Sequence, residues 1–172
     1  MKNTSKWDWQ PKDTIKVVVI VILIILTGWV SAKYSAQRNL WKETSGVYEK
    51  LNSKKLHPGK YVVMFYKKDC VYCQKAMPIV QKEFTKKASN VTFYKVDANT
   101  KNGKKLAGYY SVTSTPTMVT FRVKHGKISS TEAFSITKDL RTQRKGHIKS
   151  KDIHVKKDLI HKLMQGQEIW ND

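Results

Sequence analysis

Apolar and polar positions divide the chain into one long apolar run and several shorter ones. Residues 17–30 are almost wholly Val, Ile and Leu. Further along, residues 61–66, 91–98 and 117–124 are rich in aromatic and β-branched side chains, which favour β-strands. Apolar residues at helical spacing follow the first two of these segments. The pattern therefore predicts a membrane-inserting segment followed by an α/β domain.

The order of the predicted elements indicates how the domain is connected. We predict strands at 61–66, 91–98, 117–124 and 127–136, and helices at 35–56, 71–88, 99–111 and 152–165, the last with Val155, Leu159, Ile160, Leu163 and Met164 inward and Gly166 at its end. The first strand–helix–strand unit predicts a parallel pair, and His125-Gly126 predicts an antiparallel hairpin. The basic stretch 137–150 is predicted to be an irregular surface loop, whose role the sequence does not give.

The helix predicted at 35–56 precedes the first strand of the domain. Leu40, Val47, Tyr48 and Leu51 form its apolar stripe, while Lys and Ser dominate the opposite face. A solvated stalk is the alternative interpretation. We therefore divide the chain into a short tail at 1–16, a transmembrane anchor at 17–32, a helical linker at 33–56, the folded domain at 57–165 and a C-terminal tail at 166–172.

The apolar run has two interpretations, and both send the domain across the membrane. Lys16 and Lys33 flank the run, as in a single-pass anchor. Alternatively, the run is the core of a signal peptide cleaved after Ala32, because Val30-Ser31-Ala32 has the small-residue form of a cleavage site. The positive-inside rule, taken literally, favours a cytoplasmic domain. A short tail before a signal anchor and a long following domain favour an extracytoplasmic one.

The only two cysteines stand together as Cys70-Val71-Tyr72-Cys73, between the first predicted strand and the helix that follows it. Two sulfurs three residues apart in a helical turn can close a disulfide. Cys70 stands at the helix start, where unpaired backbone N–H groups and the helix dipole stabilise a thiolate. With no further cysteines for a structural disulfide framework, the pair is either redox-active or part of a metal site.

These residues, together with two further features, resemble the thioredoxin superfamily. Pro78 stands five residues after Cys73, where the active-site helix of that family carries a kinking proline. Residues 110–117 read YSVTSTPT, which matches the family's segment around its cis-proline. The resemblance covers about residues 55–165 and implies a thioredoxin-like α/β fold, with a central mixed β-sheet flanked by helices. It also implies that Pro116 is the cis-proline and lies against the redox pair.

The resemblance assigns roles to the residues around the pair. Cys70 is expected to be the attacking thiol and Cys73, one turn into the helix, the resolving thiol of a redox-active disulfide. Tyr72, Thr115 and Pro116 are expected to bind the substrate, because the backbone edge beside a cis-proline can pair with an extended peptide. No metal is expected, and no cofactor beyond the disulfide of the pair itself.

Two positions depart from thioredoxin itself. Asp69 stands where thioredoxin has a tryptophan, and a carboxylate beside a thiolate raises the pKa of the thiol. Met64 stands where thioredoxin has a buried aspartate that assists proton transfer from the resolving thiol. With the aromatic Tyr72 before the second cysteine and Thr115 before the proline, these departures favour an oxidase, an isomerase or a dedicated partner reductase.

The charge of the chain bears on its surroundings and on competing functions. The net charge is +20 and Lys supplies almost all of the basic residues, which suggests contact with anionic lipids or with a bacterial wall polymer. Specific nucleic-acid binding is not expected, because Arg is scarce and no groove-reading motif is present. A closed zinc site needs four ligands, and no histidine pair has ligand spacing; His154 and His161 are seven residues apart on the predicted last helix.

The sequence therefore predicts a thiol–disulfide oxidoreductase that acts on protein thiols and disulfides. It is expected at the cell membrane as a single-pass protein with its domain outside, or secreted if the apolar segment is cleaved. The alternative is a thioredoxin-fold accessory protein that docks on a secretion, conjugation or peptide-export machine. The direction of electron flow, the client and the oligomeric state do not follow from the sequence.

Overall fold

The computed structural model describes residues 11–52, 56–141, 147–167 and 169, and the chain divides into two compact units, Met1–Asn39 and Leu40–Asp172. The helices are α1 (Pro11–Leu40), α2 (Val47–Asn52), α3 (Val71–Phe84), α4 (Lys101–Tyr109), the short 3-10 helix η1 (Ser150–Asp152) and α5 (Lys157–Met164). The strands are β1 (Gly59–Tyr66), β2 (Val91–Asp97), β3 (Thr117–Lys124), β4 (Lys127–Ser135), β5 (Thr137–Asp139) and β6 (Ile153–Val155).

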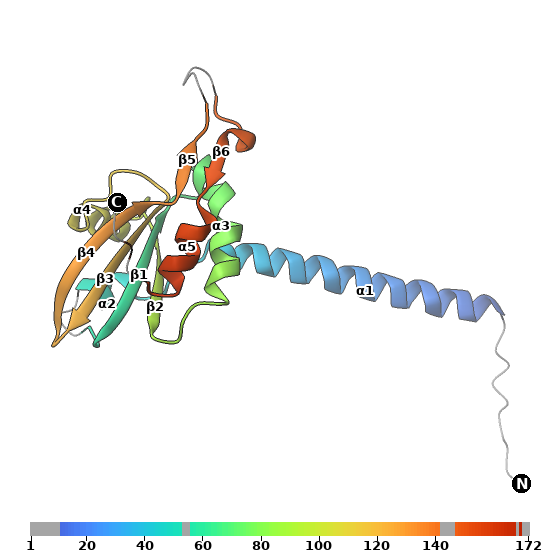
Figure 1. The fold of residues 1–172 in the computed structure, drawn as a ribbon. Helices are drawn as coiled ribbons and strands as arrows, with labels where there is room; N and C mark the ends of the chain where they lie inside the picture. Colours follow the sequence, from blue (N-terminus) through green and yellow to red (C-terminus); the bar gives the residue numbers. More distant parts are fainter. Residues whose placement is uncertain (1–10, 53–55, 142–146, 168, 170–172) are drawn as a thin grey trace, which may run out of the picture. The chain divides into compact units, whose positions relative to one another are not determined.

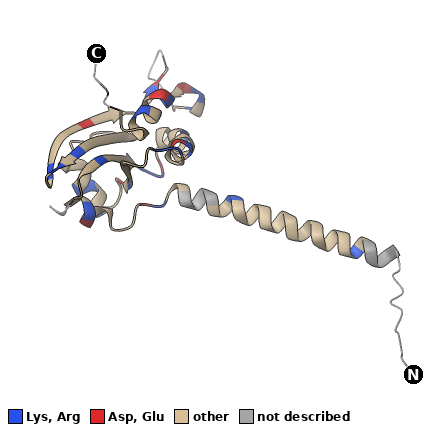
Figure 2. Cartoon of the chain, turned by 60° about the horizontal axis from the view of Figure 1, so that its bottom comes forward, with Lys and Arg blue, Asp and Glu red and all other residues tan. Residues whose placement is uncertain are grey.

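The apolar run lies within the long helix α1. Its segment Ile15–Ser35 has 21 residues and a mean hydropathy of 2.6, which at 1.5 Å per residue is long enough to cross a hydrocarbon core of about 30 Å. Figure 2 shows this segment almost free of Lys and Arg. A membrane span and a signal sequence share these properties. The helix extends beyond the predicted anchor of residues 17–32 at both ends, because no Gly or Pro interrupts the flanking sequence.

Four strands of the second unit form one mixed sheet in the order β2-β1-β3-β4 (Figure 1). β1 and β2 are parallel, and Tyr66 lies opposite Asp97 where both strands end. β1 and β3 are antiparallel, and so are β3 and β4, which turn at His125 and Gly126 with positive φ. The predicted parallel pair and the predicted hairpin are confirmed.

Successive residues of β1 enter two different cores, because side chains alternate between the faces of a sheet. Val62, Met64 and Tyr66 pack with α3 and α5 on one face. Val63 and Phe65 pack with α2 and α4 on the other. All five side chains are buried, which explains why the strand reads as a continuous apolar run. The domain is thus a mixed sheet with helices on both faces, as predicted.

Helix α3 starts directly after Cys70 and contains Pro78. It ends at Phe84 rather than at the predicted Ala88. The backbone N–H of Ala88 donates to the carbonyl oxygen of Met164 at 3.0 Å, so it bonds to the end of α5 instead of continuing α3.

The prediction of one helical linker at 33–56 is wrong. α1 ends at Leu40 and α2 is a separate helix, with Val47 and Leu51 buried against the sheet. Between the helices, the N–H of Thr44 donates to the carbonyl oxygen of Lys95 at 3.1 Å, and the N–H of Lys95 donates to Thr44 Oγ1 at 2.9 Å. These bonds attach the segment to the edge strand β2, so the folded domain begins at Leu40 and not at residue 57.

The predicted irregular loop at 137–150 and helix at 152–165 are both partly wrong. β5 pairs with β6 to form a second, two-stranded sheet, and α5 begins only at Lys157. Ile153 and Val155 alternate with exposed His154, so they are buried on a strand rather than on a helix. Ile160, Leu163 and Met164 are buried as predicted. Residues 142–146 of the predicted loop lie outside the described residues.

Candidate active site

The two cysteines lie at the junction of β1 and α3. Cys70 is the N-cap of α3 and is partly exposed, whereas Cys73 lies one turn into the helix and is buried. The backbone N–H of Cys73 donates to Cys70 Sγ at 3.4 Å. Both cysteines are free thiols in this structure. The helix start thus presents one sulfur to solvent and keeps its partner in the core.

The loop before β3 brings a second segment to the exposed sulfur. Cys70 Sγ lies 3.4 Å from the carbonyl oxygen of Thr115, 45 residues further along the chain. The Thr115–Pro116 peptide bond is cis, and Pro116 is buried. The backbone of this loop therefore lines the redox pair.

The pKa values of the two thiols are shifted in opposite directions. The pKa of Cys70 is lowered to about 5, chiefly by the hydrogen bond with the Cys73 side chain; backbone N–H groups of Cys73 and Tyr72 lower it further, and burial opposes them. The pKa of Cys73 is raised, first by that same hydrogen bond and then by burial. The backbone N–H of Lys67 points at Cys73 Sγ from 3.5 Å. The arrangement holds a thiolate at the surface and a thiol beneath it.

Asp69 does not produce the high Cys70 pKa that its position predicts. Its carboxylate is exposed and accepts a hydrogen bond from Asn99 Nδ2 at 3.1 Å. The pKa of Cys70 is low in spite of this neighbour, chiefly because of the hydrogen bond with the Cys73 side chain and then because of the backbone N–H groups at the helix start. Met64 is fully buried in the cluster that also contains Cys73, Met77 and Met118. An apolar side chain therefore occupies the place of the carboxylate that thioredoxin has there.

A family model described as Thioredoxin matches residues 43–143. The chain belongs to the thioredoxin family. Oxidised mitochondrial thioredoxin 3 from Saccharomyces cerevisiae is 27% identical to it, with a TM-score of 0.39 over 50% of this chain and 76% of that chain. Thioredoxin from Fasciola hepatica is 29% identical over the same shares, with a TM-score of 0.38. Thioredoxin O2 from Arabidopsis thaliana is 22% identical, with a TM-score of 0.40 over 51% of this chain and 77% of that chain. No curated protein matches the chain.

Membership in the thioredoxin family confirms the predicted fold class and supports thiol–disulfide oxidoreductase chemistry in general. The match includes both cysteines and Pro116. It starts at residue 43, before α2, which agrees with a domain that begins earlier than the predicted residue 57. It ends at residue 143, between β5 and β6.

Tyr72, expected to bind substrate, also contacts a part of the chain that the sequence does not connect with it. Its hydroxyl donates to Asp139 Oδ2 at 3.1 Å, from α3 to β5. Arg141 donates to the same carboxylate from Nη2 at 2.7 Å and from Nε at 3.0 Å. The Arg141 guanidinium, first, and then the tyrosine hydroxyl lower the pKa of Asp139. No spacing signal in the sequence reveals this contact, because the partners are 67 residues apart.

The sequence also did not predict a set of polar contacts beside the ends of β1 and β2. The N–H of Asp97 donates to Glu43 Oε1 at 3.3 Å, and the Tyr66 hydroxyl donates to the carbonyl oxygen of Trp41 at 2.7 Å. Burial, above all, raises the pKa of Glu43. These bonds attach the segment after α1 to the sheet, so their role is structural.

Among the described residues, no three His, Cys, Asp or Glu side chains lie close enough together to hold a metal ion. His161 lies in α5 and pairs with Glu83 at 2.8 Å, whereas His154 lies in β6 and not on the last helix as predicted.

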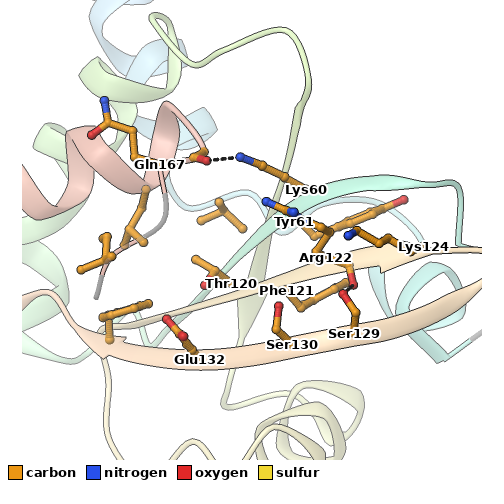
Figure 3. A pocket seen from close by; sticks show the side chains of 15 residues that line it. Lys60, Tyr61, Thr120, Phe121, Arg122, Lys124, Ser129, Ser130, Glu132 and Gln167 are labelled. Carbon is orange, nitrogen blue, oxygen red and sulfur yellow. Dashed lines mark hydrogen bonds between the residues drawn. The ribbon is translucent and has the colours of Figure 1, made fainter. Parts of the chain in front are cut away.

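A cavity of about 300 Å³ lies away from the redox pair (Figure 3). Its walls come from the start of β1, the end of β3, the edge strand β4 and the segment after α5, including Lys60, Arg122 and Gln167. Lys60 Nζ donates to the carbonyl oxygen of Gly166 across it. Because β1 and β3 reach the cysteines at their other ends, this cavity is separate from the candidate active site.

Proposed function

We propose that this protein catalyses thiol–disulfide exchange on protein substrates, with Cys70 as the attacking thiol and Cys73 as the resolving thiol. The observation that carries the proposal is the pairing of a partly exposed, low-pKa sulfur with a buried, high-pKa sulfur one turn away. The backbone around Thr115 and Pro116 lies beside the attacking sulfur, where an extended client segment can pair with it.

The reaction balances without a cofactor. The Cys70 thiolate attacks one sulfur of a client disulfide, so a mixed disulfide forms and the other client sulfur leaves as a thiolate and takes a proton. Cys73 then gives up its proton and attacks Cys70 Sγ, which forms the Cys70–Cys73 disulfide and releases the client's remaining thiolate. The client gains two electrons and two protons, and oxidation of a client dithiol is the reverse sequence. A second protein dithiol or disulfide must reset the pair.

The low pKa of Cys70 bears on the direction of electron flow. A stabilised thiolate stabilises the reduced state, which makes the corresponding disulfide a stronger oxidant. Met64, an apolar side chain in the same cluster as Cys73, stands where thioredoxin has its buried carboxylate. We therefore propose oxidation or isomerisation of client cysteines, with a reduction potential closer to about −120 mV than to about −270 mV. Equilibration of the full chain against glutathione mixtures measures it.

We also propose that the domain works outside the cytoplasmic membrane, as a single-pass protein or as a secreted one. The apolar length of α1 supports insertion into the membrane, and the net charge of +20 suits contact with anionic lipids or wall polymers. In intact cells, a membrane-impermeant maleimide is expected to label Cys70. Labelling only after lysis would place the domain in the cytoplasm.

Trapping tests the reaction. In the full-length Cys73→Ala variant, the mixed disulfide between Cys70 and a client has no resolving thiol and accumulates. We expect DTT-sensitive adducts after acid quenching of cells, which mass spectrometry identifies. The Cys70→Ser/Cys73→Ala variant is the control and is expected to carry none. Equal adduct patterns in the two variants would refute exchange through Cys70.

A further inference from the structure

A two-stranded hairpin lies beside the redox motif. β5 and β6 form their own two-stranded sheet, separate from the four-stranded sheet of the domain. The thioredoxin match stops at residue 143, within this hairpin. Figure 1 shows the hairpin beside α3, and both β6 and η1 contact that helix. The hairpin therefore lies at the active-site end of α3, and its second strand falls outside the thioredoxin match.

The described part of the hairpin is packed and bonded. Ile136, Ile153 and Val155 are buried at its base. The N–H of Leu140 donates to the carbonyl oxygen of Asp152 at 2.8 Å, and the N–H of Lys156 donates to that of Ile136 at 2.9 Å. These hydrogen bonds join the two arms of the hairpin, and Ile136 and Val155 pack it against α3.

Tyr72 attaches the hairpin to the redox motif itself. It stands between the two cysteines in sequence, and its hydroxyl donates to Asp139 on β5. Arg141 holds that carboxylate with two nitrogens, so the geometry of the acceptor is set from both sides. A client that reaches Cys70 therefore meets Tyr72 and the hairpin next to it.

The exposed charge of the hairpin is positive. Lys138, Lys149 and Lys151 are exposed. Its two carboxylates are engaged within the hairpin: Asp139 with Arg141, and Asp152 Oδ2 with the N–H of Lys149 at 2.9 Å. Near the cysteines, Lys67 and Lys68 add positive charge, while Asp69 is bonded to Asn99. Anionic groups approaching this side of the active site are thus attracted at short range.

We propose that the β5–β6 hairpin, held to the redox motif through Tyr72, is a client-recognition surface that selects polypeptides with acidic side chains near their reactive cysteine. The proposal rests on the proposed function, because it names the client class of that same site. An acidic polypeptide fits better than a membrane surface, because the hairpin that carries these lysines is bonded to Tyr72 of the redox motif, where a client must bind in order to react. Recognition by charge accelerates encounter more than it changes the chemical step.

The test compares exchange rates of matched disulfide peptides with the reduced full chain in neutral lipid nanodiscs. The peptides share one disulfide loop and differ only in flanking residues, which are acidic, uncharged or basic. At low salt we expect the acidic peptide to react about tenfold faster than the basic one, and the ratio to fall toward one at high salt. Hydroxyethyl disulfide, small and uncharged, reports the chemistry alone.

Two charge-matched variants locate the effect. Lys138→Gln/Lys149→Gln/Lys151→Gln is expected to slow the acidic peptide roughly fivefold and to leave hydroxyethyl disulfide unchanged. The control, Lys82→Gln/Lys86→Gln/Lys127→Gln, removes the same charge from exposed positions away from the cysteines and is expected to change each rate less than about twofold.

Each other outcome has a distinct meaning. No exchange with any disulfide would refute the proposed function itself. Exchange that does not depend on peptide charge, or an equal loss in both triple variants, would refute recognition by the hairpin. Loss of binding to phosphatidylglycerol vesicles in the hairpin variant, with unchanged peptide rates, would overturn the proposal and assign the lysines to a membrane surface.

Discussion

Two segments approach the redox pair, and they differ in chemistry. The loop at Thr115 and Pro116 lies within the region matched by the thioredoxin family and offers a backbone carbonyl to Cys70. The β5–β6 hairpin extends beyond that match and offers side chains, with Asp139 bonded to Tyr72. The first segment carries no charge, whereas the second exposes lysines.

The difference separates reactivity from selection. The Cys73 thiol, with the backbone groups at the helix start, lowers the pKa of Cys70 whatever the client, so these groups set the reactivity of Cys70. Charged side chains discriminate between clients by their sequence. Reactivity and selection can be tested separately, and the largest effect is expected where the sulfur itself is changed.

Removing the attacking sulfur has the largest expected effect. Cys70→Ser abolishes exchange with every disulfide, because a hydroxyl at neutral pH is not a comparable nucleophile. Cys73→Ser keeps the first step and stops at the mixed disulfide. Stopped-flow assays with hydroxyethyl disulfide, followed by mass spectrometry, distinguish the two. Retained turnover in Cys70→Ser would exclude the assigned roles.

The pH dependence of alkylation tests the reactivity of Cys70. With a pKa of about 5, Cys70 is about 90% thiolate at pH 6, whereas an ordinary thiol near 8.5 is about 0.3% thiolate. The reactive form is the thiolate, so the iodoacetamide rate rises as pH increases through about 5 and levels off above about pH 6. Cys70→Ser removes this phase, since the pKa of Cys73 is raised. A rate still rising between pH 7 and 9 would contradict the stabilised thiolate.

Met64→Asp tests the buried apolar cluster around Cys73. A carboxylate at this fully buried position is expected to destabilise the domain by about 3 kcal/mol at pH 7. Burial raises the carboxyl pKa in the folded state above its unfolded value of about 3.9, so the loss is smallest below that pH and grows as pH rises. Urea unfolding of the reduced full chain across pH measures it. Met64→Leu, a volume-conserving control, costs less than about 1.5 kcal/mol and adds no pH dependence. The same pH dependence of stability in both variants would disprove that the buried carboxyl group at position 64 causes it.

The smallest effect is expected where the hairpin meets the motif. Tyr72→Phe removes the hydroxyl that donates to Asp139 and keeps the ring. The hairpin is then expected to open more often, so hydrogen exchange at the Leu140 amide, which bonds to Asp152, rises roughly two- to fivefold. Exchange with hydroxyethyl disulfide is expected to stay within about twofold of the parent rate. An unchanged exchange rate at the Leu140 amide would show that the Tyr72–Asp139 hydrogen bond does not hold the hairpin in place.

The elements with strong local signals were predicted well from the sequence. The apolar run at 61–66 corresponds to β1, because a strand buried on both faces needs continuous apolar sequence, and the β-branched and aromatic run at 91–98 corresponds to β2. The C-x-x-C pair was located by its spacing and the Thr115–Pro116 segment by its resemblance to the thioredoxin superfamily, and the structure brings them together. Here the local sequence, together with the family resemblance, was sufficient.

Tertiary structure decided the rest. Strands β5 and β6 have three residues each, too few for a periodic pattern, and they are defined only by pairing with each other and packing on α3. The domain start at Leu40 depends on bonds between Thr44 and Lys95, 51 residues apart. Tyr72 meets Asp139 only because the chain returns to α3 after β4. Such contacts depend on which distant segments pack side by side, and a local pattern of residues does not carry that information.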